Sequence, residues 1–246
     1  LVGDGKVALQ ELLPLVRRRA RTYWSEFVAG LRAQEEQVTD SREGLTPRNA
    51  LLALDRRLTA DMCVVTDVGQ HQMWAAQTLR FERPRAFVTS GGLGTMGFGL
   101  GAAIGAAMGT GRRTVLVTGD GGFYMCLNEL ACATGERLPI VILLMNNAGL
   151  GMVRQWQRLF YGRRYSATSL DGRQTDFVAL ARAFGADGAR AASLAELEDA
   201  LDVAFAGEGP FLIDCQIGAD ELVLPMIRPG GTLDDVFYRV DEQEGA

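Results

Sequence analysis

Two almost continuously apolar runs constrain this chain most. They are TVLVTGD (114–120) and PIVILLMNN (139–147), and each ends in polar residues. Strands formed from such runs are buried on both faces, and they occur in the middle of parallel sheets covered by helices. We therefore predict an α/β fold with a mostly parallel sheet flanked by helices on both faces.

Further strand-like and helical segments alternate from residue 46 to residue 217. We predict additional strands at residues 63–68, 86–90 and 210–217, and a small-residue helix over residues 92–109. Another helix is predicted to follow residue 120 and run through Asn128 and Ala133. Three more helices are predicted to begin at Thr46-Pro47, at Asp176 and at Ser193, which forms a capping box with Glu196.

Residues 1–45 differ from the rest of the chain. Their helical periodicity turns polar at VTDSREG (38–44), so we predict the end of a preceding domain and a linker. The run Arg17-Arg18-Arg19 is predicted to lie on a solvated helix face. Residues 46–246 are predicted to form a C-terminal domain with a tail. The first residues, Leu-Val-Gly-Asp, hold neither an initiator Met nor an apolar signal segment, so we expect a piece of a longer chain.

Composition excludes several classes of function. The net charge of −5 over 246 residues argues against a nucleic-acid partner, and no apolar run approaches the ~20 residues that span a membrane. The four cysteines form no C-x-x-C pair, so reduced, mostly buried thiols are expected and a zinc site is not. We therefore expect a cytoplasmic protein, with a plastid location left open.

Polar residues follow the two apolar runs where each predicted strand ends. Asp120 follows the first run, and Asn146 and Asn147 end the second. The carboxyl ends of parallel strands form the ligand-binding edge of such sheets. A carboxylate and an amide oxygen are ligands that Mg²⁺ accepts, usually together with phosphate oxygens. Glycines 119, 121 and 122 allow close backbone approach. The pattern thus favours a magnesium–diphosphate site.

The alternative is that these polar residues only form turns and bind no metal. A lone G-D-G and an Asn-Asn pair each occur often as simple turns. The absence of a G-x-x-x-x-G-K-[ST] motif argues against an ordinary nucleotidase.

The chain resembles a known family through one short signature and four longer motifs. Gly119-Asp120-Gly121 followed by Asn146-Asn147 resembles the signature of thiamine diphosphate enzymes. Within them, TDVGQHQMW (66–74), SGGLGTMGFGL (90–100), NNAGLGMVRQWQ (146–157) and LPMIRPGGTLDDV (224–236) resemble the catalytic subunits of acetolactate synthases. The similarity runs from about Leu1 to Val236 and implies the C-terminal, diphosphate-binding part of that family.

The resemblance implies roles for particular residues. Asp120, Asn147 and the carbonyl of Gly149 would bind Mg²⁺, and Met96 would hold the cofactor in a bent shape. Met152, Val153 and Trp156 would line the substrate pocket, where the indole favours 2-ketobutyrate. The full set of cofactor contacts that it implies is Gln70, His71, Gly94, Thr95, Met96, Asp120, Gly121, Gly122, Asn147, Gly149, Leu150, Gly151 and Met152.

The family activity implied is decarboxylation of pyruvate and its condensation with pyruvate or 2-ketobutyrate, on the route to branched-chain amino acids. The resemblance also implies FAD bound mainly elsewhere, a homodimer or tetramer, and a small regulatory subunit as a candidate partner. In the family a glutamate from an N-terminal domain of the neighbouring subunit activates the cofactor. No glutamate here matches that motif, so no catalytic residue is assigned and little turnover is expected from this chain alone.

Two alternatives stay open. One is another thiamine diphosphate enzyme, such as a pyruvate oxidase, a glyoxylate carboligase or a 2-keto acid decarboxylase. The other is a non-catalytic cofactor-binding module.

Overall fold

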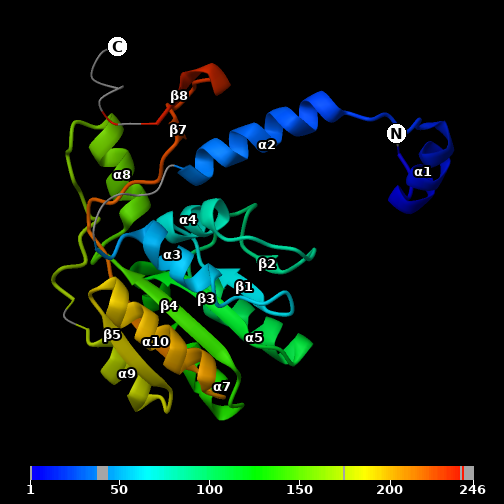
Figure 1. Cartoon of the computed structure of the whole chain (residues 1–246). Helices are drawn as coiled ribbons and strands as arrows, with labels where there is room; N and C mark the ends of the chain where they lie inside the picture. Colours follow the sequence, from blue (N-terminus) through cyan, green and yellow to red (C-terminus); the bar gives the residue numbers. More distant parts are fainter. Residues whose placement is uncertain (1, 38–43, 174, 239, 241–246) are drawn as a thin grey trace. The chain divides into compact units, whose positions relative to one another are not determined.

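A computed structural model describes residues 2–37, 44–173, 175–238 and 240 (Figure 1). The chain divides into two compact units, Leu1–Ser41 and Arg42–Ala246. Most of the predicted linker (38–43) and the last residues of the predicted tail (241–246) lie outside the described residues. The boundary proposed at residues 45 and 46 stays a prediction.

The first unit consists of α1 (Gly5–Leu12), the 3-10 turn η1 (Leu13–Leu15) and α2 (Thr22–Gln37). Asp4 caps α1 by accepting hydrogen bonds from the N–H groups of Lys6 and Val7. Pro14 lies in η1, where the ring and the missing N–H prevent the α-helix from continuing. The chain is therefore non-helical from residue 16 to residue 21, and the prediction of a helix face for the three arginines (17–19) is wrong, although they are exposed.

The second unit is built on one six-stranded sheet in which every neighbouring pair is parallel. The strand order is β2 (Phe87–Val88), β1 (Cys63–Thr66), β3 (Thr114–Gly119), β4 (Ile140–Asn146), β6 (Phe211–Gln216) and β5 (Asp187–Ala191). This confirms the predicted α/β fold. Strand β5 was not predicted from the sequence DGARA, because an edge strand does not have to be apolar on both faces.

Helices alternate with the strands as predicted. They are α3 (Pro47–Asp55), α4 (Gln70–Thr78), α5 (Phe98–Thr110), α6 (Asp120–Tyr124), η2 (Leu127–Glu129), α7 (Leu130–Gly135), α8 (Gly151–Phe160), α9 (Phe177–Ala183) and α10 (Leu194–Ala206). The caps at Thr46 and Asp176 and the capping box of Ser193 with Glu196 are confirmed. The helix predicted for 92–109 begins only after Gly97, whose φ of 83° is left-handed. The helix predicted through Asn128 and Ala133 is divided into α6, η2 and α7.

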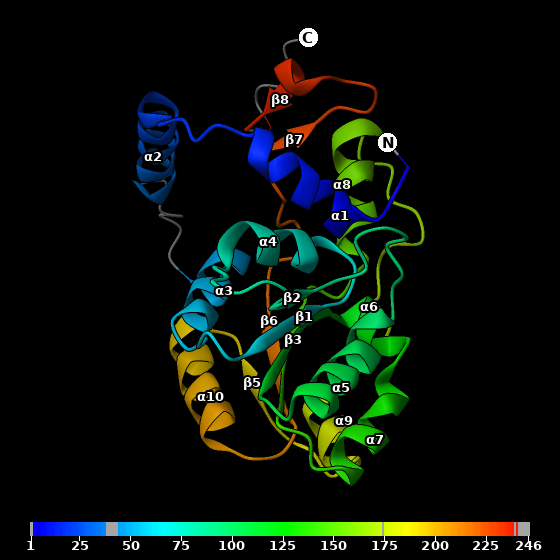
Figure 2. The ribbon, with the colours of Figure 1, turned by 90° about the vertical axis from the view of Figure 1, so that its right-hand side faces the viewer.

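Each central strand contributes to two hydrophobic cores. Val141, Leu143 and Met145 of β4 pack with residues of α3, α4 and α10. The alternate residues Ile140, Ile142 and Leu144 pack with residues of α5, α7 and α9. Figure 2 shows α3 and α10 on one side of the strands and α5, α7 and α9 on the other. Because side chains alternate along a strand, a run that is apolar at every position is satisfied only in this three-layer arrangement.

The strand order places the crevice of the sheet between β1 and β3. From β1 the chain moves outward to β2, and it then crosses to β3 on the other side of β1. Such a switch point opens a crevice at the carboxyl ends of the strands, where ligands of open α/β sheets bind. Helix α4 follows β1 and α6 follows β3, so their first residues border this crevice.

The rest of the second unit includes a small hairpin of β7 (Met226–Ile227) and β8 (Val236–Phe237), with η3 (Leu233–Asp235) between them.

Cys63, Cys126 and Cys215 are buried free thiols and Cys132 is an exposed one, as expected for mostly buried reduced cysteines. Among the described residues no helix is long and apolar enough to cross a membrane.

Candidate functional site

A pocket lies at the carboxyl ends of β1, β3, β4 and β6 and collects most of the predicted site residues. Its cavity volume is about 60 Å³, room for a few water-sized groups. The pocket therefore has room for a metal ion with attached oxygen groups. The predicted residues that line it are Gln70, His71, Met96, Asp120, Gly121, Gly122, Asn147, Gly149, Leu150, Gly151, Met152 and Val153.

Three predicted residues do not line this pocket. Gly94 and Thr95 are exposed in the turn before α5, where the N–H of Thr95 donates to Ser90 Oγ at 3.1 Å. Trp156 lines a neighbouring hollow of about 570 Å³ together with Val153, which borders both spaces. Met152 and Trp156 are four residues apart on α8 and share a face, but a helix rises about 6 Å over four residues. The indole is therefore carried one turn beyond the pocket.

The two predicted metal-ligand side chains line the same pocket. The N–H of Gly149 donates to Asn147 Oδ1 at 3.2 Å. Burial raises the pKa of Asp120 to about 6, and the N–H groups of Gly121 and Gly149 oppose that shift by hydrogen bonding to its carboxylate. The pairing of β3 with β4, which places Gly119 opposite Met145, brings the two side chains together. A bound cation would favour the charged carboxylate in the same way as these N–H groups.

Glycines shape the floor of the pocket. A Cβ on Gly121 would lie 2.6 Å from Leu150 Cδ2. A Cβ on Gly151 would collide with Gln70 Oε1 and lie 2.6 Å from Asn147 Nδ2. Any side chain at these positions would displace pocket residues, so glycine allows Leu150, Gln70 and Asn147 to pack directly on the backbone.

Two pocket side chains carry polar atoms with no partner. Among the described residues only three buried side-chain nitrogen or oxygen atoms lack a hydrogen bond, and two of them are Gln70 Oε1 and His71 Nε2. Leaving such an atom unpaired costs about 1–3 kcal/mol, which a polar ligand would recover. Burial lowers the pKa of His71 to about 4 against the opposing effect of Asp67, so the imidazole is neutral at pH 7.

The amide of Gln70 is fixed by a second buried amide. Gln70 Nε2 donates to Gln155 Oε1 at 2.7 Å and to the Glu221 carbonyl at 2.8 Å. Gln155 also accepts from the Val223 N–H and donates to the Val223 carbonyl. Both N–H groups of Gln70 are thereby used, so the atom it offers to the pocket is an acceptor that suits a metal-bound water. Its predicted contact with the cofactor stays a prediction.

Residues 220–224 are tied to the helices on both sides of the pocket. Five consecutive carbonyls accept hydrogen bonds from side chains of α4 and α8. The donors to residues 220, 221, 222, 223 and 224 are Arg158, Gln70, Trp74, Gln155 and Gln77, in that order. This segment therefore connects the helix that carries His71 with the helix that carries Met152 and Val153.

Asp67 is a buried residue of the site to which the sequence motifs assigned no role. Its side chain is fully buried directly after β1. It accepts from the N–H groups of Val68 (2.8 Å), Gly97 (3.1 Å) and Gly99 (2.7 Å). The carboxylate thus anchors the turn that carries Met96 and the first residues of α5. A single Asp after an apolar strand was the signal available in the sequence.

Comparisons with known proteins agree with this site. Residues 67–215 match the family described as thiamine pyrophosphate enzyme, C-terminal TPP binding domain. The match begins at Asp67 and includes every residue of the pocket except Ile217.

Three acetolactate synthases illustrate the similarity. The isozyme 2 large subunit of Escherichia coli is 41% identical over 98% of this chain and 43% of its own length. The Mycobacterium bovis enzyme is 39% identical over 96% of this chain and 40% of its own. The chloroplastic enzyme of Arabidopsis thaliana is 38% identical over 97% of this chain and 38% of its own. The chain thus spans about two fifths of the length of these curated relatives. It belongs to the thiamine pyrophosphate enzymes, and residues 67–215 are their C-terminal cofactor-binding domain.

Proposed function

We propose that the pocket binds thiamine diphosphate through Mg²⁺, with Asp120, Asn147 and the carbonyl of Gly149 as metal ligands. The observation that carries this proposal is that Asp120 and Asn147 line one pocket together with two buried polar atoms that lack a hydrogen-bond partner. Hard oxygen ligands with room for phosphate suit Mg²⁺. Among the described residues no cluster of three or more His, Cys, Asp or Glu side chains offers an alternative metal site.

Thiamine diphosphate, when bound, supplies the electron sink for making and breaking carbon–carbon bonds next to a carbonyl. The residues of this chain bind and orient it. His71 presents an unpaired ring nitrogen, and Gly151 lets Gln70 and Asn147 pack closely beside it in the pocket. Met96 lines the pocket wall, where it would contact the rings of the cofactor.

We further propose that the protein is the large subunit of an acetolactate synthase. The identity of 38–41% to these enzymes extends over 96–98% of the chain and so includes residues on both sides of the cofactor-binding match. Under this proposal FAD and the activating glutamate are held mainly by parts of the enzyme outside residues 1–246. A small regulatory subunit remains a candidate partner, and a cytoplasmic or plastid location fits the same activity.

A product assay tests this assignment. The full-length enzyme, with the parts outside residues 1–246, is purified and incubated with pyruvate, Mg²⁺, thiamine diphosphate and FAD, and separately with glyoxylate. Acetolactate as the main product supports the proposal. Acetaldehyde, an oxidised two-carbon product or condensation of glyoxylate would instead identify a decarboxylase, an oxidase or a carboligase. Cofactor binding without any of these products would support a non-catalytic module.

Trp156 is proposed to select the second substrate. It is 37% exposed, packs edge-on against Phe160 and borders the hollow next to the pocket. One additional methylene against an apolar surface is worth about 1–3 kcal/mol. Trp156→Leu is therefore expected to lower the preference for 2-ketobutyrate over pyruvate by about tenfold, with acetolactate formation retained. A competition assay on the full-length enzyme with both acceptors measures the product ratio, and an unchanged ratio would assign Trp156 to packing alone.

We also propose a homodimer or tetramer. Leu93, Met108 and Met125 are 94%, 58% and 57% exposed, on or next to α5 and α6. Large apolar side chains that are exposed on a single chain would be covered by contact with another chain. Light scattering of the purified protein is expected to give at least twice the monomer mass. A strictly monomeric species at high concentration would contradict the proposal.

A further inference from the structure

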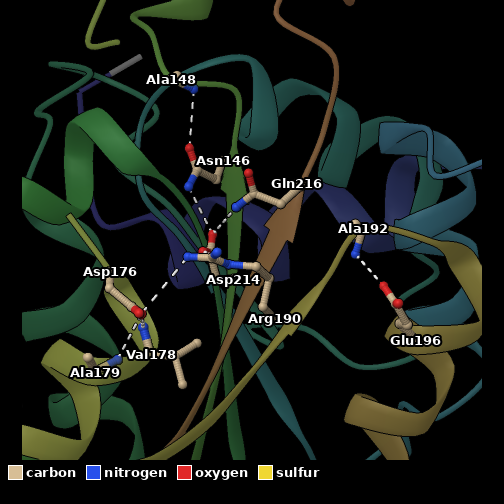
Figure 3. Close-up of polar contacts among 10 residues, drawn as sticks. All are labelled: Asn146, Ala148, Asp176, Val178, Ala179, Arg190, Ala192, Glu196, Asp214 and Gln216. Carbon is tan, nitrogen blue, oxygen red and sulfur yellow. Dashed lines mark hydrogen bonds and ion pairs between the residues drawn. The ribbon is translucent and has the colours of Figure 1, made fainter. Parts of the chain in front are cut away.

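Asp214 is a buried charge at the carboxyl end of β6. The side chain is fully buried, and Figure 3 shows the groups that surround it. Its Oδ1 accepts from Asn146 Nδ2 at 2.9 Å and from Gln216 Nε2 at 2.7 Å, and its Oδ2 accepts from Arg190 Nε at 3.3 Å. A buried carboxylate is tolerated only when it is paired and hydrogen-bonded in this way.

The contact with Asn146 connects Asp214 to the turn that follows β4. Asn146, the last residue of β4, contacts Asp214 of the neighbouring strand β6, while Asn147, directly after β4, lines the pocket. The Oδ1 atom of Asn146 in turn accepts from the Ala148 N–H at 3.2 Å (Figure 3). One amide thus bridges the fully buried carboxylate and the backbone immediately after Asn147.

This turn has a conformation that needs external support. Ala148 has a φ of 52°, in the left-handed region that a non-glycine residue adopts at a cost. Its carbonyl accepts from the Leu170 N–H at 2.8 Å. On the β6 side, the support is Asn146 held by Asp214. The turn ends at Gly149, whose carbonyl is a proposed metal ligand.

We propose that Asp214 is a positioning residue for the metal site and acts through Asn146. It holds residues 146–149 so that the Asn147 amide oxygen and the Gly149 carbonyl face the same point as Asp120. This inference rests on the proposed magnesium–thiamine diphosphate site. Groups that orient metal ligands without touching the metal typically change metal affinity by about 10- to 100-fold when they are replaced.

The test uses Asp214→Asn, Asn146→Ala and the double variant, with Arg190→Met as the matched control. Arg190→Met removes the other arm of the Asp214 network and leaves the Asn146 contact intact. The Mg²⁺ concentration for half-maximal thiamine diphosphate binding is measured by calorimetry on the purified protein. Thermal unfolding and hydrogen exchange of the Ala148 and Leu170 N–H groups are measured without ligand.

Both single variants are expected to raise the half-saturating Mg²⁺ concentration about 10- to 100-fold and to speed exchange at Ala148. The double variant is expected to raise the half-saturating Mg²⁺ concentration no more than the more affected single variant, because Asp214 acts through Asn146. Arg190→Met is expected to lower the unfolding temperature and to leave the half-saturating Mg²⁺ concentration unchanged. If Asp214→Asn does not fold, Asn146→Ala carries the test alone.

A purely structural role for Asp214 would lower the unfolding temperature and leave Mg²⁺ half-saturation unchanged, and that result would overturn the inference. Additive effects of Asp214→Asn and Asn146→Ala would overturn the route through Asn146. Failure of the unmodified protein to bind thiamine diphosphate with Mg²⁺ would contradict the proposed function itself, so the two failures are distinguishable.

Discussion

Replacing Asp120 by alanine is expected to abolish magnesium-dependent binding of thiamine diphosphate while the fold is kept. Asp120 is the carboxylate among the proposed metal ligands, and Mg²⁺ depends strongly on such charged oxygens. Its side chain is only 2% exposed, and burial already raises its pKa to about 6. The ligand-free protein therefore gains little from this charge, and its loss leaves the unfolding free energy undiminished. Calorimetric titration with the cofactor, with and without Mg²⁺, measures the effect.

The matched control for this substitution is Asp202→Ala. Asp202 lies on α10 with its side chain 69% exposed and pairs with Arg57 at 2.7 Å, away from the pocket. This variant is expected to bind the cofactor with unchanged affinity. If Asp120→Ala keeps its Mg²⁺-dependent affinity, the assignment of Asp120 as a metal ligand is rejected. If Asp120→Ala does not fold, the buried charge of Asp120 does stabilise the ligand-free protein, contrary to the argument above.

Gly151→Ala is expected to weaken cofactor binding by about 100-fold, because a methyl group at this position disturbs two pocket side chains. The new Cβ would collide with Gln70 Oε1 and approach Asn147 Nδ2 to 2.6 Å. Gln70 cannot move freely, since Gln155 and the Glu221 carbonyl hold its amide nitrogen. Overpacking of this kind costs about 1–3 kcal/mol, and the upper value corresponds to roughly two decades in affinity.

Gly209→Ala serves as the control for Gly151→Ala. A Cβ on Gly209 meets nothing within 4 Å, and this glycine does not have a positive φ. Cofactor affinity is expected to be unchanged in this variant. If Gly151→Ala binds thiamine diphosphate as tightly as the unmodified protein, the close approach of its backbone to Gln70 and Asn147 has no part in the site.

The central strands and helix starts were predictable from the sequence because their signals are local. A run such as PIVILLMNN admits one arrangement, a strand buried on both faces, and β4 has it. The caps at Thr46, Asp176 and Ser193 depend on side chains within three residues of the helix start. By contrast, the edge strand β5 was missed, because an edge strand does not need an apolar run. The arginines after η1 were wrongly assigned to a helix, because the proline in η1 ends the helical pattern before them.

The core of the candidate site was also predictable, for a topological reason. Asp120 and Asn147 directly follow strands that pair with each other, so parallel pairing alone brings them together. The residues that hold this site in place were not predictable. Asp67 binds N–H groups 30 and 32 residues further along the chain, and Asp214 binds an amide 68 residues before it. Such contacts depend on the folded sheet, and the local sequence around each aspartate does not reveal them.

The most direct test of the account is a calorimetric titration of the purified protein with thiamine diphosphate, in the presence of Mg²⁺ and then of EDTA. The proposed site predicts saturable binding of one cofactor per chain with Mg²⁺ and none with EDTA. It also predicts that Asp120→Ala and Gly151→Ala weaken binding while Asp202→Ala and Gly209→Ala do not. Binding of equal strength with EDTA, or no binding by the unmodified protein, would contradict the assignment of the pocket at the ends of β1, β3 and β4.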